Sequence, residues 1–217
     1  MGKRELLIAA VFLVVGVCVF QFAAPPAKSN DTGFSISKLV NEIKRDVKGR
    51  ESFTAPPRTV KYAIGPDVTE LRVEGLNSAV KIIGEDRQDV ELVLSVTSTG
   101  ETEAAANAIA AKVAMVEDRV ANALTLRANF PSEERQTASA SLRVPARLAV
   151  RLDAPRDPSV TNVKSLEFLN PARGAAVISK VALVRGDQTG GDLTMSEVAD
   201  AKMLLTRVRA RIPMPEE

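Results

Sequence analysis

The chain has 217 residues, enough for one domain with a substantial core, and a formal net charge of +2. It contains no histidine and a single cysteine, Cys18. This composition excludes the usual serine and cysteine catalytic triads and argues against a zinc site. The near-neutral charge gives no electrostatic reason to expect a nucleic-acid partner. No cofactor is expected.

The first feature in chain order is an uncharged apolar run, Leu6–Ala24. A helix of this length would span about 28 Å, close to the hydrocarbon thickness of a bilayer. Lys3 and Arg4 precede the run and predict a cytoplasmic N-terminus. Residues 1–24 are therefore expected to be a transmembrane anchor or a signal. The expected location is single-pass in the inner (cytoplasmic) membrane, with the remaining chain periplasmic or extracellular.

Two alternatives to an uncleaved anchor involve processing. A signal cleaved after Ala24 would have Phe22 three residues before the cut and Pro25 directly after it, and both are unfavourable. A lipid-modified Cys18 is disfavoured because bulky Val17 precedes it and the apolar run continues beyond it. The uncleaved anchor is therefore the preferred interpretation.

Residues 25–56 are expected to be a proline-containing linker and one amphipathic helix. The helix is indicated by apolar residues that fall on one face, namely Ile36, Leu39, Val40, Ile43 and Val47. It could pack on the following domain or form a stalk, or it could lie on a membrane surface. The first interpretation is preferred because the apolar face is narrow and lacks a bulky aromatic side chain.

From Val60 onward the hydrophobic pattern changes to a period of two, which is typical of strands with one buried face. The alternating segments are Leu71–Val73, Val80–Ile82, Val90–Val96, Leu124–Phe130, Ala138–Val144 and Leu148–Leu152. One alanine-rich segment, Glu103–Glu117, instead predicts a helix that covers an end or edge of the sheet. Its N-cap could be Ser98, in a capping box with Glu101, or Thr99 or Thr102.

The last third contains a near-repeat with an offset of 17 residues, in which Gly174–Val181 is echoed by Gly191–Val198. A weaker copy lies at Val160–Val163. Such a short period favours one β-solenoid coil per repeat, although two similar hairpins would give the same echo. Residues 198–208 fit either a strand or a helix, whereas 206–212 alternate as a strand. The expected fold class is therefore mainly β: a short-coil, β-helix-like solenoid over residues 57–217 with one covering helix, preceded by a single transmembrane helix.

These segments resemble the bacterial putative-adhesin family of unknown function, whose exported domain is a small β-solenoid. The resemblance covers about residues 60–212 and is carried by Leu71–Gly84, Asp89–Leu92, Leu142–Ala146 and the glycine-led coils at Gly174 and Gly191. Family members usually open each coil with a glycine–aspartate pair. Here Gly191-Asp192 keeps the pair and Gly174-Ala175 does not. These are core and turn positions, so the resemblance implies the fold and no particular activity.

Two sets of carboxylates are candidate sites. Asp187 and Asp192 flank a glycine-rich stretch and could supply calcium ligands, but a tight turn is preferred because calcium usually needs more oxygen ligands. Asp153, Asp157 and Glu167 could serve a glycosidase or lyase, but no spacing singles out a pair. The chain is therefore expected not to be an enzyme, and no catalytic or metal-binding residue is assigned.

Six arginines alternate with the apolar residues of the expected strands and should therefore face outward: Arg127, Arg143, Arg151, Arg207, Arg209 and Arg211. They could form an ordinary solvated face, which is the preferred interpretation, or a basic strip for an anionic partner. Arg207, Arg209 and Arg211 are the candidate anionic-partner surface. The expected function is a non-enzymatic, membrane-anchored envelope protein for adhesion or scaffolding, with the sensory or regulatory ectodomain of an envelope stress system as the alternative. The expected partners are the membrane, through Leu6–Ala24, and an envelope protein or an anionic glycan or lipid.

Overall fold

Strands make up most of the described chain. The computed structural model describes residues 51–130 and 135–211. The elements in chain order are β1 (Glu51–Thr54), β2 (Arg58–Ala63), β3 (Glu70–Glu74), β4 (Ala79–Glu85), β5 (Asp89–Gly100), α3 (Glu103–Ala110), β6 (Ala114–Val120), β7 (Ala123–Asn129), β8 (Gln136–Pro145), β9 (Ala149–Leu152), β10 (Arg156–Phe168), β11 (Ala172–Arg173), β12 (Ala176–Thr189), β13 (Asp192–Thr206) and β14 (Arg209–Arg211). The expected mainly β composition is confirmed.

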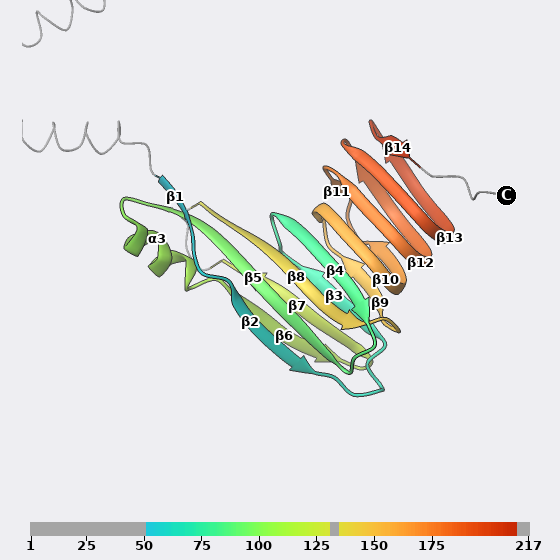
Figure 1. Ribbon diagram of the computed structural model, residues 1–217, viewed down its shortest axis with the longest axis horizontal. Helices are drawn as coiled ribbons and strands as arrows, with labels where there is room; N and C mark the ends of the chain where they lie inside the picture. Colours follow the sequence, from blue (N-terminus) through green and yellow to red (C-terminus); the bar gives the residue numbers. More distant parts are fainter. Residues whose placement is uncertain (1–50, 131–134, 212–217) are drawn as a thin grey trace, which may run out of the picture. The chain divides into compact units, whose positions relative to one another are not determined.

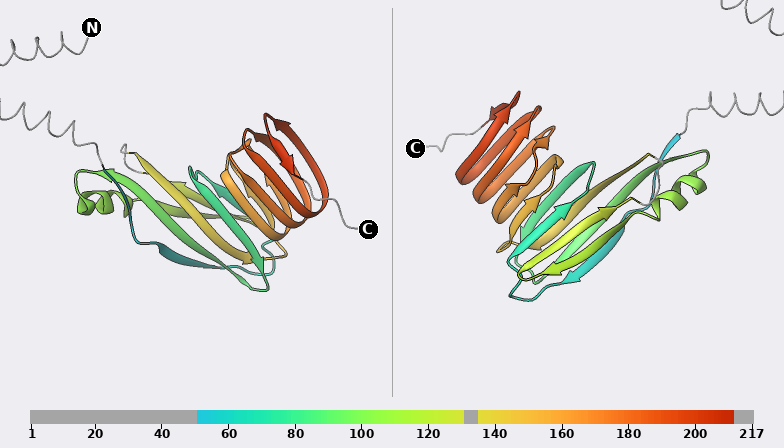
Figure 2. Two further views of the ribbon diagram at one scale, coloured as in Figure 1. Left: turned by 45° about the horizontal axis from the view of Figure 1, so that its top comes forward. Right: turned by 180° about the vertical axis from the view of Figure 1, so that it is seen from behind.

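The strands form two layers that are joined by the long strands β10, β12 and β13 (Figures 1 and 2). The first half of β10 pairs with β4, whereas its second half pairs with β9 in the other layer. Each long strand changes direction at a residue with positive φ: Asn162 (57°), Lys180 (53°) and Glu197 (52°). Each therefore supplies one strand segment to both layers, which is the geometry of a solenoid coil.

The coils stack in parallel and in register. Val160, Ile178 and Met195 are successive partners, and so are Val163, Val181 and Val198. The two strong copies and the weaker copy of the sequence repeat therefore occupy equivalent positions. Parallel pairing rules out the alternative of two similar hairpins, since hairpin strands are antiparallel.

The half of the fold nearest β1 is built differently from the coils. β5 pairs antiparallel with β1, β2 and β8, and β6 pairs antiparallel with β7. Parallel pairing begins at β3 and β4. The described chain is therefore an antiparallel two-layer sandwich that continues into a parallel solenoid.

The core lies between the two layers and is almost entirely aliphatic. The alternating residues of the sequence point into it, and many are completely buried, for example Leu71, Ile82, Leu92, Leu124, Leu142, Leu166, Ile178 and Leu193. Burial of a leucine or isoleucine side chain contributes about 1.5–3 kcal/mol. Interlocking aliphatic side chains, with one layer of strands on each side, thus hold the described domain together.

The helix is shorter than the sequence predicts. α3 ends at Ala110, and the rest of the expected helix is the edge strand β6. Thr102 is the N-cap, and its hydroxyl accepts a hydrogen bond of 3.2 Å from the Ala105 amide. The helix stops because the Arg58 guanidinium binds the carbonyl oxygens of Ala110 and its neighbours, and because pairing with β7 overrides the helical propensity of the alanine-rich segment.

Residues 198–206, which the sequence left open between strand and helix, are a strand. They belong to β13 and pair with β12 through Ala201 opposite Val184 and Leu205 opposite Gln188. Val184 and Gln188 are fully buried in the preceding coil. The spacing of Ala201 and Leu205, which also fits a helix, therefore matches the spacing of inward-facing positions in that coil.

The expected transmembrane helix needs correction. Across residues 51–130 and 135–211, no helix is long and apolar enough to cross a bilayer. The expected fold class, which included a single transmembrane helix, is therefore wrong as far as the structure describes the chain. The expected single-pass location in the inner membrane is wrong for the same reason. Leu6–Ala24, on which both expectations depended, and the expected amphipathic helix after it lie outside the described residues.

Candidate functional site

Three of the six arginines singled out in the sequence are neutralised by carboxylates on neighbouring strands. Arg127 Nε lies 3.0 Å from Glu74, and Arg143 Nε lies 3.8 Å from Glu85. Arg151 bridges two carboxylates, with distances of 3.2 Å to Glu70 and 2.7 Å to Glu167. These exposed cross-strand pairs stabilise the sheet modestly and leave little net charge for a partner.

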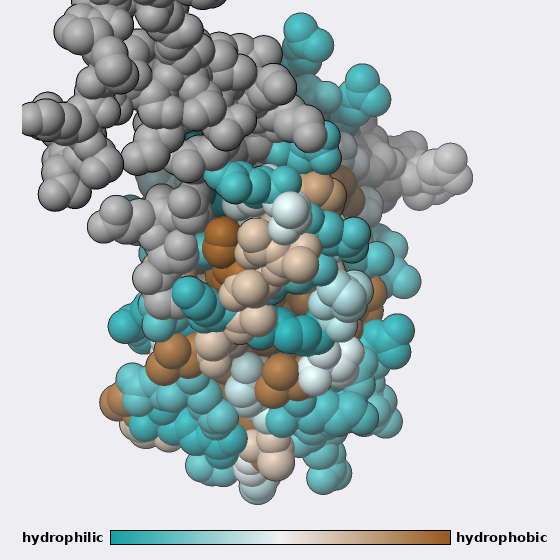
Figure 3. Space-filling model, turned by 90° about the vertical axis from the view of Figure 1, so that its left-hand side faces the viewer, coloured by the Kyte–Doolittle hydropathy of each residue, from teal (hydrophilic) through white to brown (hydrophobic). Residues whose placement is uncertain are grey.

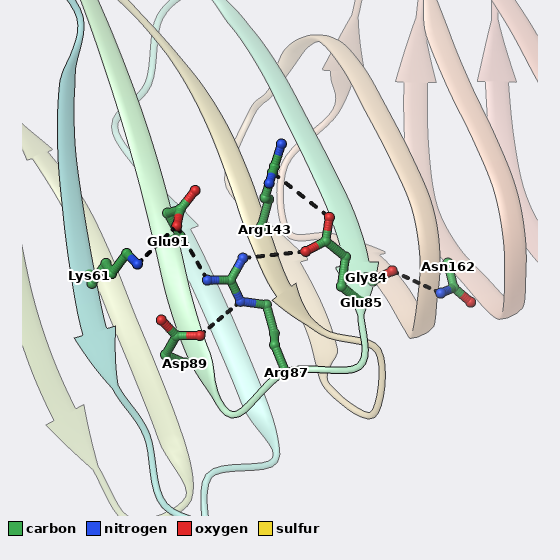
Figure 4. Close-up of polar contacts among 8 residues, drawn as sticks. All are labelled: Lys61, Gly84, Glu85, Arg87, Asp89, Glu91, Arg143 and Asn162. Atoms are coloured by element: carbon green, nitrogen blue, oxygen red, sulfur yellow. Dashed lines mark hydrogen bonds and ion pairs between the residues drawn. The ribbon is translucent and has the colours of Figure 1, made fainter.

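A second ion-pair cluster lies at the turn between β4 and β5 (Figure 4). The Arg87 guanidinium contacts Asp89 at 2.8 Å, and Glu85 and Glu91 each at 3.4 Å. Its hydrogen bond to Arg87 lowers the pKa of Asp89 from its ordinary value. Because every carboxylate of this cluster faces a cation, the cluster is best understood as a clasp that fixes the turn.

The remaining three arginines, Arg207, Arg209 and Arg211, lie together at the C-terminal end of the coils. Arg209–Arg211 form β14 and pair in parallel with the start of β13, and Arg207 occupies the preceding turn with φ 57°. All three side chains are exposed. None forms an ion pair with a carboxylate within the described part of the chain, although Asp192 is the strand partner of Arg209.

Two further arginines, which the sequence analysis missed, lie on the earlier coils, nearer to β4. Arg156 on β10 and Arg173 on β11 are direct partners in a parallel pair, and both are exposed. The row continues from Arg173 to Thr189 and then to Thr206, the residue before Arg207. Arg156, Arg173 and Arg207 are separated by one and two repeats of 17 residues, so the repeat itself could have revealed the row.

The carboxylates considered for catalysis have structural partners. Glu167 pairs with Arg151, and Asp153 Oδ1 accepts a hydrogen bond of 2.6 Å from Asn170. Asp157 Oδ1 accepts a hydrogen bond of 2.8 Å from the Ala175 amide. The three carboxylates therefore engage three different partners, and the structure does not bring them together as a catalytic pair.

The last coil is only partly covered. β14 pairs with Asp192–Thr194, and among residues 51–130 and 135–211 the second half of β13 has β12 as its partner on one side only. Leu204 is 65% exposed and Leu205 39% exposed, whereas the preceding coil buries Val184 and Gln188 fully. At the opposite end, Figure 3 shows a narrow band of moderately hydrophobic residues bordered by hydrophilic ones.

Comparisons with known proteins give one weak structural match. No family model and no curated protein matches the chain. A solved structure described as a putative cell adhesion protein from Clostridium sporogenes matches with a TM-score of 0.28 and 9% sequence identity, over 70% of this chain and 73% of that one. At this TM-score the match carries no argument about fold or function, and the family resemblance rests on the sequence motifs alone.

Proposed function

We propose that the protein is a non-enzymatic binding module of the adhesion or scaffolding kind, and that it contacts an anionic partner through the C-terminal end of its coils. One observation carries the proposal. Arg207, Arg209 and Arg211 are exposed and form no ion pair within the described residues, although Asp192 is the strand partner of Arg209, whereas Arg127, Arg143 and Arg151 are ion-paired. Unpaired guanidinium groups can bind carboxylates or phosphates through bidentate hydrogen bonds.

Two further features support a contact role over a catalytic one. The carboxylates considered for catalysis, Asp153, Asp157 and Glu167, are engaged in hydrogen bonds or an ion pair. The stacked coils also present regular rows of outward side chains, and repeat folds of this type commonly bind partners along such surfaces. Both features favour recognition by an extended surface.

The test is retention of the full-length protein on an immobilised polyanion. We expect the wild type to bind at low salt and the variant R207E/R209E/R211E to elute early, because three attractive contacts become repulsive. The matched control is K81E/K112E/K164E, which makes the same change in net charge at three exposed lysines elsewhere. Equal loss in both variants, or unchanged retention of the arginine variant, would contradict the proposal.

A further inference from the structure

The row that begins at Arg156 extends the basic end of the coils into a directional surface. Arg156, Arg173, Thr189 and Thr206 are successive partners across parallel strands, and Arg207 follows Thr206. Neighbouring strands lie about 4.8 Å apart, so the four partners span roughly 14 Å along the direction in which the coils stack. We name these five residues the arginine row.

We propose that the arginine row binds a linear acidic polysaccharide whose chain runs along the stacking direction of the coils. The inference rests on the proposed function and specifies its partner. Carboxylate groups of the polysaccharide would pair with the guanidinium groups, while its hydroxyl groups would exchange hydrogen bonds with the threonine hydroxyls. A linear chain fits because the row is one residue wide and several strands long.

The guanidinium groups of the row are free to bind. The neighbouring carboxylate of Asp157 is directed to the Ala175 amide, and that of Asp153 to the Asn170 side chain. Arg156 and Arg173 face each other directly on adjacent strands without an intervening carboxylate in the described residues. Like charges in this position destabilise a sheet, so a bound anion between them would relieve the repulsion.

The surroundings of the row favour a polysaccharide over a protein or a membrane. Protein interfaces depend on buried aromatic or other apolar anchors, and the row consists of arginine and threonine beside the Gly190–Gly191 turn. A side chain added at Gly190 would meet no atom within 4 Å, so the surface beside the row is open. Membrane-surface binding usually adds a broad apolar face that inserts between lipids, whereas the exposed apolar side chains beside the row are those of Leu204 and Leu205 at its C-terminal end.

The experiment measures binding of polygalacturonate oligomers to the full-length protein by calorimetry. We expect R156Q/R173Q to weaken binding at least about tenfold, since two charge-assisted contacts are lost. The matched control is R185Q/K202Q. Arg185 and Lys202 are also exposed cations paired in register on adjacent strands, but they lie outside the row. The control should keep wild-type affinity, and methyl-esterified oligomers should not bind.

Each other result overturns a definite part of the proposal. Equal weakening by both variants would show a response to net charge alone. Tighter binding of poly-L-glutamate would identify an acidic protein as the partner, and tighter binding of phosphatidylglycerol vesicles a membrane. If R207E/R209E/R211E abolishes polyanion binding and R156Q/R173Q changes nothing, the row is excluded while the proposed function stands. If neither variant matters, both fail. Circular dichroism would confirm that every variant is folded.

Discussion

The side-chain amide of Asn162 donates a hydrogen bond of 2.8 Å to the carbonyl oxygen of Gly84 (Figure 4). Asn162 is the bend of β10, and its φ of 57° is a conformation that asparagine tolerates better than most residues. The bond ties the first long coil strand to β4, so the solenoid is fastened at this point to the strand on which it is built.

Substitution of Gly84 by alanine should destabilise the protein. A Cβ at Gly84 would lie 1.6 Å from the Asn162 carbonyl oxygen, and a backbone atom cannot move away easily. We expect G84A to lower the free energy of unfolding by about 3 kcal/mol or more in urea denaturation, the upper end of the cost of overpacking. The control is G190A, which adds a methyl group in open space at φ +70° and should cost only the backbone strain, about 1–2 kcal/mol. Equal or greater loss in G190A would contradict the tight contact at Gly84.

Loss of the Arg58 side chain should loosen the end of α3. Its guanidinium donates to the carbonyl oxygens of Ala110 and Ala111, which have few other partners at a helix C-terminus. We expect R58A to cost about 1–3 kcal/mol and to speed amide exchange in α3. Lys61 is on the same strand and forms an exposed pair with Glu91, so K61A should cost less than about 1 kcal/mol. Unchanged exchange in α3 would show that Arg58 does not hold the helix end.

The register of β13 can be tested with two leucines. Leu193 is fully buried and Leu204 is 65% exposed. We therefore expect L193A to cost about 2–5 kcal/mol and L204A less than about 0.5 kcal/mol. The measurement is thermal or urea unfolding of both variants. The reverse order would mean that the strand is shifted by one residue, which moves every side chain to the opposite face.

Acid should weaken the clasp at the β4–β5 turn. The Arg87 hydrogen bond lowers the pKa of Asp89 from 3.8, so the charged form is favoured more in the folded state than in the unfolded chain. The resulting stabilisation is present above about pH 4 and is lost as the pH falls through the lowered folded pKa. We expect the Tm of the wild type to fall more steeply between pH 4 and 2 than that of D89N. The substitution D86N, at an exposed neighbour outside the clasp, should leave the wild-type pH dependence intact.

The sequence predicted the strands well because one face of each is buried. Leu92 and Leu94 on β5 alternate with half-exposed residues, and this pattern depends on local geometry alone. The 17-residue echo likewise predicted which residues stack, since Ile178 and Met195 must fill the same position in successive coils. β6 was missed because Ala114–Val120 follows an alanine-rich helix, and only pairing with β7 makes it a strand.

The candidate site was only partly predictable for a different reason. Whether an arginine is free depends on carboxylates that are distant in the sequence, as with Glu70 and Arg151, which lie 81 residues apart. The alternation of inward and outward residues along a strand cannot distinguish an arginine in an ion pair from an unpaired one. Arg156 and Arg173, in contrast, could have been found from their spacing of one coil period.

The partly covered last coil has a consequence for how the protein would open. In a solenoid each coil is stabilised chiefly by its direct neighbours. Within the described residues, β14 and the second half of β13 have a neighbour on one side only, so unravelling should start there and proceed inward. A polysaccharide bound from Arg156 to Arg207 would cross every junction between these coils and hold neighbouring coils together. Binding of the polysaccharide should then slow amide exchange throughout β12 and β13, including at residues far from the bound groups.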